Sequence, residues 1–424
     1  MPAAEPVPPE AVVDHLGPTA DVIVPLGNGE PVAVLDAIEA AAARFEHLRI
    51  HQMHALHDRP SMHGAFGDRI RHRSYFLSAV TRPRYAAGTI DLVPSNFSEM
   101  RELLRATTTD PLVVAAASPL DRHGYFSLGV SADYTASFIG RGRFFLEANA
   151  HMPRTFGRNQ LHISQVAGWC EVDRPLLEVP PVPGGPLDDR IAAYVAERIP
   201  DGATIQIGIG GTPNAILRAL SGHRDLGVHT ELLSDGIVDL VETGVVNGVR
   251  KRLNRTKTVG TFALGTERLH RMMDDNPAFE LWPVSYVNDP RIIATEPGFV
   301  SINSTLTVDL LGQCASETID GRYFSSSGGQ ADFARGAMYS PGGQGFVVLH
   351  STTEDGRISK ISPTLAAGDV VTTIKNTVDK VVTEWGVAEL RGRSIRERAR
   401  ALIAIAHPDH RDDLRAAAQR LGYV

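Results

Sequence analysis

The residues best suited to chemistry lie between positions 203 and 236, in the stretch ATIQIGIGGTPNAILRALSGHRDLGVHTELLSDG. Three glycines, Gly208, Gly210 and Gly211, allow a sharp turn and a close approach of backbone to a ligand. Glu231 follows in the next segment, ahead of a Ser-Asp-Gly turn. A carboxylate beside such a loop can act as a nucleophile on an acyl or phosphoryl group, because loop N–H groups stabilise the developing negative charge.

These residues need elements that bring them together. Residues 203–207 form an apolar, β-branched run that predicts a buried strand. Residues 213–222 predict a helix, with proline in its first turn and glycine at its end. Residues 226–229 predict a second strand. Ligands bind at the carboxyl ends of strands in open α/β sheets, so we expect the glycine loop and Glu231 in one crevice.

Three interpretations of this stretch compete on the residues alone. The first is a purely structural strand–helix–strand turn. The second is a dinucleotide-binding fingerprint, with Glu231 in place of the ribose-binding acid, but the position of its last glycine is occupied by Pro213. The third makes Glu231 a nucleophile beside a loop that holds an acyl group or a phosphate. The rest of the chain has to decide between them.

Bulk composition narrows the class of protein. The 424 residues are enough for two or three domains, and 43% hydrophobic and 21% charged residues are ordinary for a globular protein. A net charge of −7 argues against general nucleic-acid binding. Cys170 and Cys314 form no C-x-x-C pair, which favours a reducing compartment and no zinc site. Without a long apolar run or a signal peptide, we expect a soluble, cytoplasmic protein that uses no metal.

The order of the predicted elements indicates an α/β fold. Strand-like and helix-like segments alternate from residue 21 to residue 150, which is typical of mostly parallel sheets covered by helices. The run PPVPGGP lies in the clearest linker, residues 177–187, after which the alternation restarts. We therefore predict a Pro-rich tail at 1–20, an α/β domain at 21–180 and a second α/β domain at 188–424.

The two predicted domains show signs of an internal repeat. Aligning Pro31 with Pro213 superposes small and apolar residues of both helices, and without a gap Arg49 falls on Glu231. A D-x-x-G sequence at 121–124 recurs at 309–312. If the halves are related, only the second carries the carboxylate, and a site at their interface is expected.

With these motifs in hand, the chain resembles the acetyl-CoA hydrolase/transferase family, class I CoA-transferases similar to 4-hydroxybutyrate and butyrate:acetate CoA-transferases. The resemblance covers nearly the whole chain after residue 20. Its segments are IQIGIGGTPNAIL with LGVHTELLSDGIVDLVETGVV, then SPLDRHGYFSLG (118–129), EANAHMPRTFG (147–157), PVSYVNDPRIIA (283–294), VSINSTLTVDLLGQ (300–313), SSSGGQADFARGA (325–337), VVTEWGVAELRG (381–392) and IAHPDHR (405–411).

The resemblance implies a fold of two related open α/β domains with mostly parallel sheets and an active site at their interface. It implies that Glu231 is the nucleophile, ionised at its ordinary pKa, and that the reaction is ping-pong through a glutamyl-CoA thioester. The expected substrates are acetate or acetyl-CoA and a short-chain acid such as butyrate or 4-hydroxybutyrate. CoA thioester is then a substrate, no cofactor is held permanently, and a homodimer is expected.

Other residues are assigned as candidates for contact with CoA or for orienting the acid. His229 would lie on the same face of an extended strand as Glu231 and could tune it. Thr307 replaces an acidic or amide residue common in relatives, which leaves acyl specificity open. Arg335 could either meet a CoA phosphate or pair with Asp332. The candidates for substrate contact are Gly208, Ile209, Gly210, Gly211, Thr212, Gly328, Gly329, Gln330, Lys360 and Asn303.

Three rival functions remain at this stage. An acyl-CoA hydrolase would use the same glutamate with water as acceptor, and water exclusion depends on pocket closure. A non-catalytic CoA-binding protein would keep the fold without turnover. An NAD-dependent dehydrogenase is disfavoured by the broken glycine motif.

Overall fold

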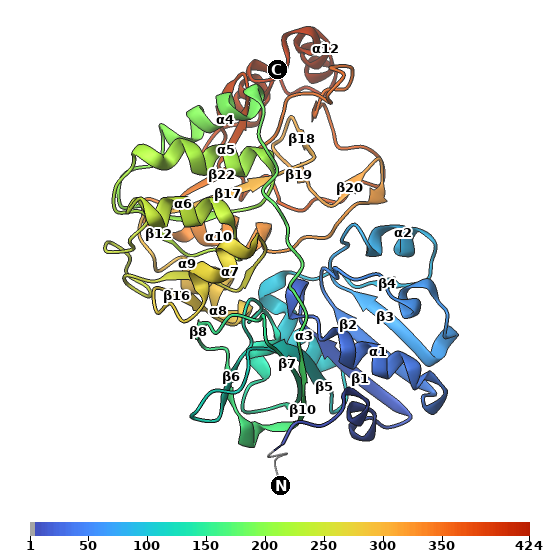
Figure 1. Ribbon diagram of the computed structural model, residues 1–424. Helices are drawn as coiled ribbons and strands as arrows, with labels where there is room; N and C mark the ends of the chain where they lie inside the picture. The colour runs from blue at the N-terminus through green and yellow to red at the C-terminus, as the bar shows by residue number, and fades with distance from the viewer. Residues whose placement is uncertain (1–4) are drawn as a thin grey trace. The chain divides into compact units, whose positions relative to one another are not determined.

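A computed structural model describes residues 5–424, which divide into two compact units (Figure 1). Residues up to Val179 together with Val259–Val287 form unit 1, and Pro180–Thr258 together with Asn288–Val424 form unit 2. The chain first passes between units within the predicted linker. Its return to unit 1 at Val259–Val287 is a feature that the sequence analysis did not anticipate, because the composition does not change there. None of the helices within 5–424 combines the length and the apolarity needed to span a bilayer.

Unit 1 is built on a wholly parallel seven-stranded sheet in the order β10-β7-β5-β1-β2-β3-β4. The interior strand β5 reads LVVAAA and is buried along its whole length, as expected for a parallel strand covered on both faces. Its strands are β1 (Thr19–Val24), β2 (His47–Gln52), β3 (Ile70–Ser74), β4 (Asp91–Leu92), β5 (Leu112–Ala117), β7 (Arg143–Asn149) and β10 (Val166–Val172).

Shorter elements complete unit 1. Its helices include α1 (Val32–Ala40), α2 (Thr81–Ala86), α3 (Met100–Thr107) and α7 (Glu267–Met273). The remaining elements are the antiparallel pair β6 (Tyr125–Ser127) and β9 (Gln160–His162), the parallel pair β8 (Phe156–Gly157) and β16 (Phe279–Leu281), β14 (Thr258–Gly260), β15 (Phe262–Ala263) and α8 (Val284–Val287).

The segment predicted as a Pro-rich tail packs against unit 1 over part of its length. Residues 1–4 lie outside the described part of the chain. Pro9–His15 form a 3-10 helix, and Val12 and Val13 are buried in the same apolar cluster as the α1 residues Val34 and Leu35. Proline starts this short helix because its missing N–H is not needed in the first turn.

Unit 2 is built on a six-stranded sheet in the order β12-β11-β17-β22-β24-β25, in which only β25 is antiparallel. Its strands are β11 (Thr204–Ile207), β12 (Gly227–Val228), β17 (Phe299–Ser304), β22 (Gln344–Val348), β24 (Lys380–Thr383) and β25 (Gly386–Glu389). The small elements after β17 are β18 (Thr307–Asp309), β19 (Cys314–Ala315), β20 (Thr318–Ile319), β21 (Arg322–Tyr323) and β23 (Ile361–Ser362); β13 (Leu232–Leu233) follows β12.

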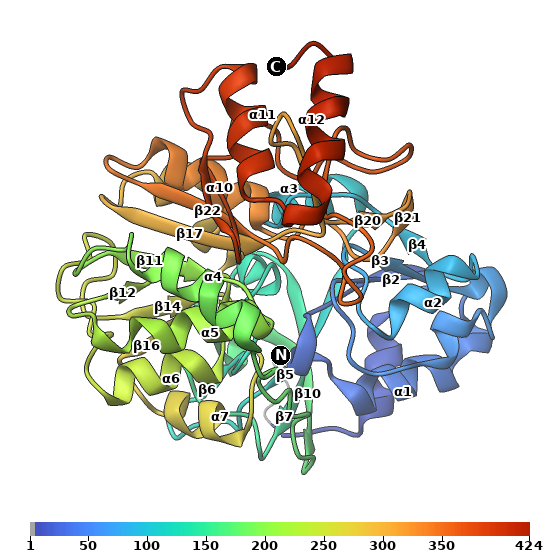
Figure 2. The same cartoon turned by 90° about the horizontal axis from the view of Figure 1, so that it is seen from above.

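Helices cover the unit 2 sheet. Helices α4 and α5 pack against each other, and Figure 2 shows α11 and α12 side by side, each with apolar residues in one core cluster. The helices are α4 (Pro186–Ala196), α5 (Gly211–Ala219), α6 (Asp235–Glu242), α9 (Pro290–Ile293), α10 (Gln330–Tyr339), α11 (Ile395–Ala404) and α12 (Arg411–Arg420).

The two sheets support the internal repeat. The order β10-β7-β5-β1-β2 in unit 1 corresponds to β24-β22-β17-β11-β12 in unit 2. The repeated D-x-x-G sequences also form the same turn: Asp121 Oδ1 accepts from the N–H groups two and four residues later, and Asp309 Oδ1 does the same. In both turns the glycine has a positive φ, 82° at Gly124 and 85° at Gly312, which explains why glycine recurs.

One detail of the repeat alignment is wrong. Strand pairing places Gly227 of β12 at the level that Ile50 occupies in β2, so the counterpart of Glu231 is His54 rather than Arg49. The ungapped alignment failed because unit 1 takes a longer path from its helix to that level of the second strand.

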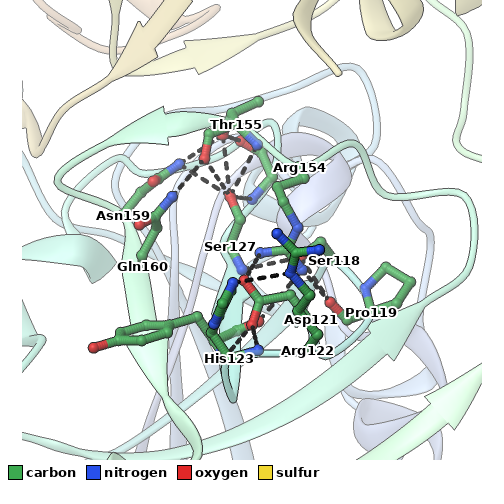
Figure 3. A network of polar contacts seen from close by, with 12 residues as sticks. Ser118, Pro119, Asp121, Arg122, His123, Ser127, Arg154, Thr155, Asn159 and Gln160 are labelled. Atoms are coloured by element: carbon green, nitrogen blue, oxygen red, sulfur yellow. Dashed lines mark hydrogen bonds and ion pairs between the residues drawn. The ribbon is translucent and has the colours of Figure 1, made fainter. Parts of the chain in front are cut away.

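Two further family-like segments form a polar network within unit 1 (Figure 3). Ser127 Oγ donates to Thr155 O at 3.0 Å, and Thr155 Oγ1 accepts from Asn159 Nδ2 at 2.6 Å. Arg154 binds Asp121 and the carbonyl of Pro119. These bonds join residues 118–129 to residues 147–160, so we assign these segments a structural role.

Candidate active site

Glu231 lies just beyond the carboxyl end of β12, where the sequence predicted it. The preceding residues fix the chain against β11: His229 N donates to Ile205 O at 3.1 Å, and Thr230 Oγ1 donates to Ile207 O at 3.2 Å. Strand β12 contains only two residues, so these two hydrogen bonds fix the segment that follows it, as the pairing of a longer strand would.

The Glu231 carboxylate is held by groups from two distant segments. Asn288 Nδ2 donates to Glu231 Oε2 at 2.7 Å, and Gly329 contributes a backbone hydrogen bond. A Cβ atom on Gly329 would lie 1.9 Å from Glu231 Oε2 and 2.2 Å from Asn288 Nδ2. Only glycine permits this approach, so the candidate residues Gly328–Gln330, here called the second glycine loop, lie against the predicted nucleophile.

The surroundings change the protonation of Glu231. Burial, the largest cause, and the negative charge of Asp332 raise the pKa of Glu231, the hydrogen bonds from Asn288 and Gly329 oppose the rise, and the net pKa is about 7. The expectation of an ordinary carboxyl pKa is therefore wrong, because the sequence does not reveal this desolvation. A carboxyl that titrates near neutrality is typical of a functional site.

Two residues of this site were not predicted to act on Glu231. Asn288 is fully buried and lies in PVSYVNDPRIIA, a segment quoted only for its family resemblance. Asp332 was considered as a partner of Arg335, but Asp332 is buried on α10 and acts on Glu231, whereas Arg335 is exposed. The Asp332 carboxylate and the Arg335 guanidinium therefore have different environments.

Buried polar atoms without partners surround the second glycine loop. Among residues 5–424, Ser326 Oγ, Gln330 Nε2 and Asn288 Oδ1 have no hydrogen-bond partner and almost no exposed surface. Buried polar groups are normally paired, so these atoms are available to a ligand. Gly328 has a φ of 53°, and Gly329 caps the N-terminus of α10.

The first glycine loop connects β11 to α5. Gly210 has a φ of 124° and caps α5, and a Cβ atom on Gly208 would meet no atom within 4 Å. Ile209 is half exposed. The hydroxyl of Thr212 binds Asp188 Oδ1 of α4. The backbone of the loop is open to a ligand, whereas the Thr212 hydroxyl holds α5 to α4.

Three other candidate residues have partners apart from Glu231. Asn303 pairs with Gln206 on β11, donating to its Oε1 at 3.1 Å and accepting from its Nε2 at 3.1 Å. The Lys360 backbone joins β18, accepting from Val308 N at 2.9 Å. The His229 ring packs edge-on against Phe299 at 6.1 Å between centroids. Their predicted contacts with substrate, and the effect of Thr307 on specificity, stay predictions.

Fold and site together define a class: a largely parallel α/β protein with a partly buried carboxylate at the carboxyl end of its sheet, in contact with a glycine loop, an arrangement suited to covalent group transfer. The sequence also matches two models of one protein family. The acetyl-CoA hydrolase/transferase N-terminal domain matches residues 11–178, and the corresponding C-terminal domain matches residues 265–418. The chain belongs to the acetyl-CoA hydrolase/transferase family.

Individual relatives cover almost the whole chain. It is 44% identical to succinyl-CoA:cyclohexane-1-carboxylate CoA transferase of Geobacter metallireducens, over 94% of this chain and 92% of the relative. It is 38% identical to 4-hydroxybutyrate coenzyme A transferase of Clostridium kluyveri, over 96% and 95%. The crystal structure of RipA from Yersinia pestis superposes with a TM-score of 0.93 at 37% identity, covering 99% of this chain and 98% of RipA.

Proposed function

We propose that this chain, an enzyme that transfers CoA between carboxylic acids, uses Glu231 as its nucleophile. The observation that carries the proposal is the contact of Glu231 Oε2 with Asn288 and Gly329. This contact fixes one carboxylate oxygen. The other oxygen can then attack a thioester carbonyl.

The reaction has four balanced steps. The Glu231 carboxylate attacks the acyl carbonyl of acyl-CoA, and the C–S bond breaks. This step releases CoA thiolate and forms an acyl-glutamyl anhydride. The thiolate attacks the glutamyl carbonyl, which releases the first acid and leaves a glutamyl-CoA thioester. A second carboxylate attacks that thioester and expels CoA thiolate. Finally the thiolate attacks the new acyl group, forming the second acyl-CoA and restoring Glu231.

Each attack creates an oxyanion that needs donors already in position. The backbone N–H groups of Gly208–Gly211 and of Gly328–Gln330 are our candidates. The unpaired Ser326 hydroxyl and Gln330 amide in the second loop support the choice, because each is a donor without a partner in the described chain. No metal, redox cofactor or prosthetic group takes part in this scheme.

For the substrates we propose acetyl-CoA or acetate with a short-chain acid such as butyrate or 4-hydroxybutyrate. The relative named for 4-hydroxybutyrate supports this pair. The relative named for succinyl-CoA and cyclohexane-1-carboxylate adds two substrates to an acceptor screen. We also propose a cytoplasmic homodimer. Two free, buried cysteines support a reducing compartment, and the family resemblance is the support for the dimer.

The mass of the intact protein after mixing with acetyl-CoA, without an acceptor acid, tests the mechanism. We expect a CoA adduct that peptide digestion maps to Glu231 and that Glu231→Gln does not form. Rapid loss of thioester without any adduct would favour the hydrolase. An adduct on another residue, or full turnover by Glu231→Gln, would contradict the assignment of the nucleophile.

A further inference from the structure

A cluster of aromatic and basic side chains lies at the far end of the unit 2 sheet from Glu231. Trp385 follows β24, and two guanidiniums lie over its ring: that of Arg190 of α4 is 5.1 Å from the ring centroid, and that of Arg411 of α12 is 5.7 Å from it. The His407 ring meets the indole edge-on at 5.4 Å. We call Trp385, Arg190 and Arg411 the Trp385 cluster.

Both guanidiniums of the cluster lack a counter-ion. In the described part of the chain neither Arg190 nor Arg411 has a carboxylate partner, and the one hydrogen bond of their guanidiniums to protein runs from Arg411 Nε to Ala406 O. The neighbouring acids are engaged elsewhere: Asp189 pairs with Arg218, and Asp412 with Arg415.

Other arginines of the described chain also lack a carboxylate partner, so what distinguishes Arg190 and Arg411 is that both guanidiniums lie beside the same indole ring. The chain has 49 acidic residues against 42 basic ones, so carboxylates are plentiful. Two cations beside one ring, without carboxylate partners in the described chain, attract an external anion. The Trp385 Nε1–H, buried and unpaired within residues 5–424, adds a donor at the same place.

The cluster and Glu231 lie along one edge of one sheet. Strands β12, β11, β17, β22 and β24 are parallel neighbours in that order, so their carboxyl ends share an edge. Glu231 follows β12, and Trp385 follows β24. Four steps between strands, each about 4.8 Å, separate the two by roughly 19 Å.

Side-chain contacts connect the intervening loops along this edge. Asp188 of α4 accepts from the Thr212 hydroxyl of the first glycine loop and from His350 Nε2, at 2.8 Å, just after β22. Next to His350, Ser351 N donates to Glu384 at 3.0 Å, and Glu384 precedes Trp385. The edge is thus held as one surface from the first glycine loop to the cluster.

A CoA molecule has matching dimensions and charge. About twelve bonds separate its sulfur from the first phosphate-bearing oxygen, which at the rise of an extended chain is roughly 14 Å. The diphosphate and the 3′-phosphorylated adenosine follow over the next few bonds. With the sulfur at Glu231 and the pantetheine arm along the first glycine loop, these phosphates reach the Trp385 cluster.

We propose that the Trp385 cluster binds the phosphates of the adenine-nucleotide end of CoA, with Arg190 and Arg411 donating to phosphate oxygens. The proposal rests on the proposed function, because it starts from the sulfur at Glu231. The indole holds both guanidiniums in place before the ligand arrives, which lowers the entropy lost on binding.

Calorimetric titration of the full chain with CoA, and separately with pantetheine, tests the site. We expect Arg190→Gln and Arg411→Gln each to weaken CoA binding by about tenfold, the loss of one charge-assisted hydrogen bond, and to leave pantetheine binding unchanged. Arg420→Gln is the matched control, because Arg420 lies at the other end of α12, roughly 13 Å along the helix. It should bind CoA as the parent does.

Folding is a small risk, since Arg190 is exposed and makes no hydrogen bond to the described protein. Thermal denaturation shows whether each variant is folded. Suppose that the parent binds CoA and forms the Glu231 adduct. Unchanged CoA binding in both variants, or an equal loss of pantetheine binding, would then overturn the assignment of the phosphate site to the Trp385 cluster. A parent that binds no CoA would instead contradict the proposed function.

Discussion

At the scale of single residues, the activity depends on the ionised fraction of Glu231. The carboxyl is held by Asn288 on one oxygen and desolvated by the surrounding protein, and the negative charge of Asp332 adds to the rise of its pKa to about 7. Only the carboxylate form is a nucleophile. At neutral pH a large part of the free enzyme therefore carries a protonated, inactive Glu231.

A pH profile of kcat/KM for acyl-CoA tests this protonation. We expect the value to rise with pH and level off above a midpoint near 7, since the folded pKa lies above the ordinary 4.5. In Asn288→Asp a second carboxylate replaces the donor, so the midpoint should move to higher pH. A midpoint near 4.5 in the parent, or no movement in the variant, would contradict the environment described for Glu231.

At the scale of elements, the sequence predicted the supports of the site better than its interior. The glycine loop after β11 and Glu231 after β12 follow from strand periodicity and turn residues, and the structure has both where expected. Asn288 reaches Glu231 across 57 residues of sequence, and no local pattern encodes that contact. The raised pKa also depends on packing around the carboxyl, which periodicity does not describe.

The junction between the second glycine loop and α10 gives an element-scale prediction. In Gly329→Ala the new methyl would overlap Glu231 Oε2, at 1.9 Å, and Asn288 Nδ2. We expect kcat/KM to fall at least a hundredfold, because displacement of a reacting group by about an ångström costs that much. The φ of −101° at this residue suits alanine, so the fold should persist.

Gly222→Ala is the control for this substitution. A Cβ atom there would meet nothing within 4 Å, and Gly222 lies in the same unit. It should change neither kcat/KM nor the melting temperature by much. Activity of Gly329→Ala close to that of the parent would mean that the loop moves freely away from Glu231, and the second glycine loop would lose its assigned role.

At the scale of the whole molecule, the nucleophile affects the stability of the chain. The unfolded chain releases the Glu231 proton near pH 4.5, whereas the folded chain keeps it until about pH 7. Between these values the unfolded state binds fewer protons, so the free energy of unfolding falls as pH rises. Sites that serve function often reduce stability in this way.

Glu231→Gln should therefore stabilise the enzyme that it inactivates. At pH 8 the variant avoids ionising a desolvated carboxyl, and we expect its free energy of unfolding to exceed that of the parent by up to about 3 kcal/mol. At pH 4.5 the parent is protonated and nearly isosteric with the variant, so the difference should vanish. Urea denaturation of both proteins at the two pH values measures this difference. Equal stability at pH 8 would mean that Glu231 ionises as readily in the folded protein as in the unfolded chain. A pH midpoint near 7 would then have no physical reason.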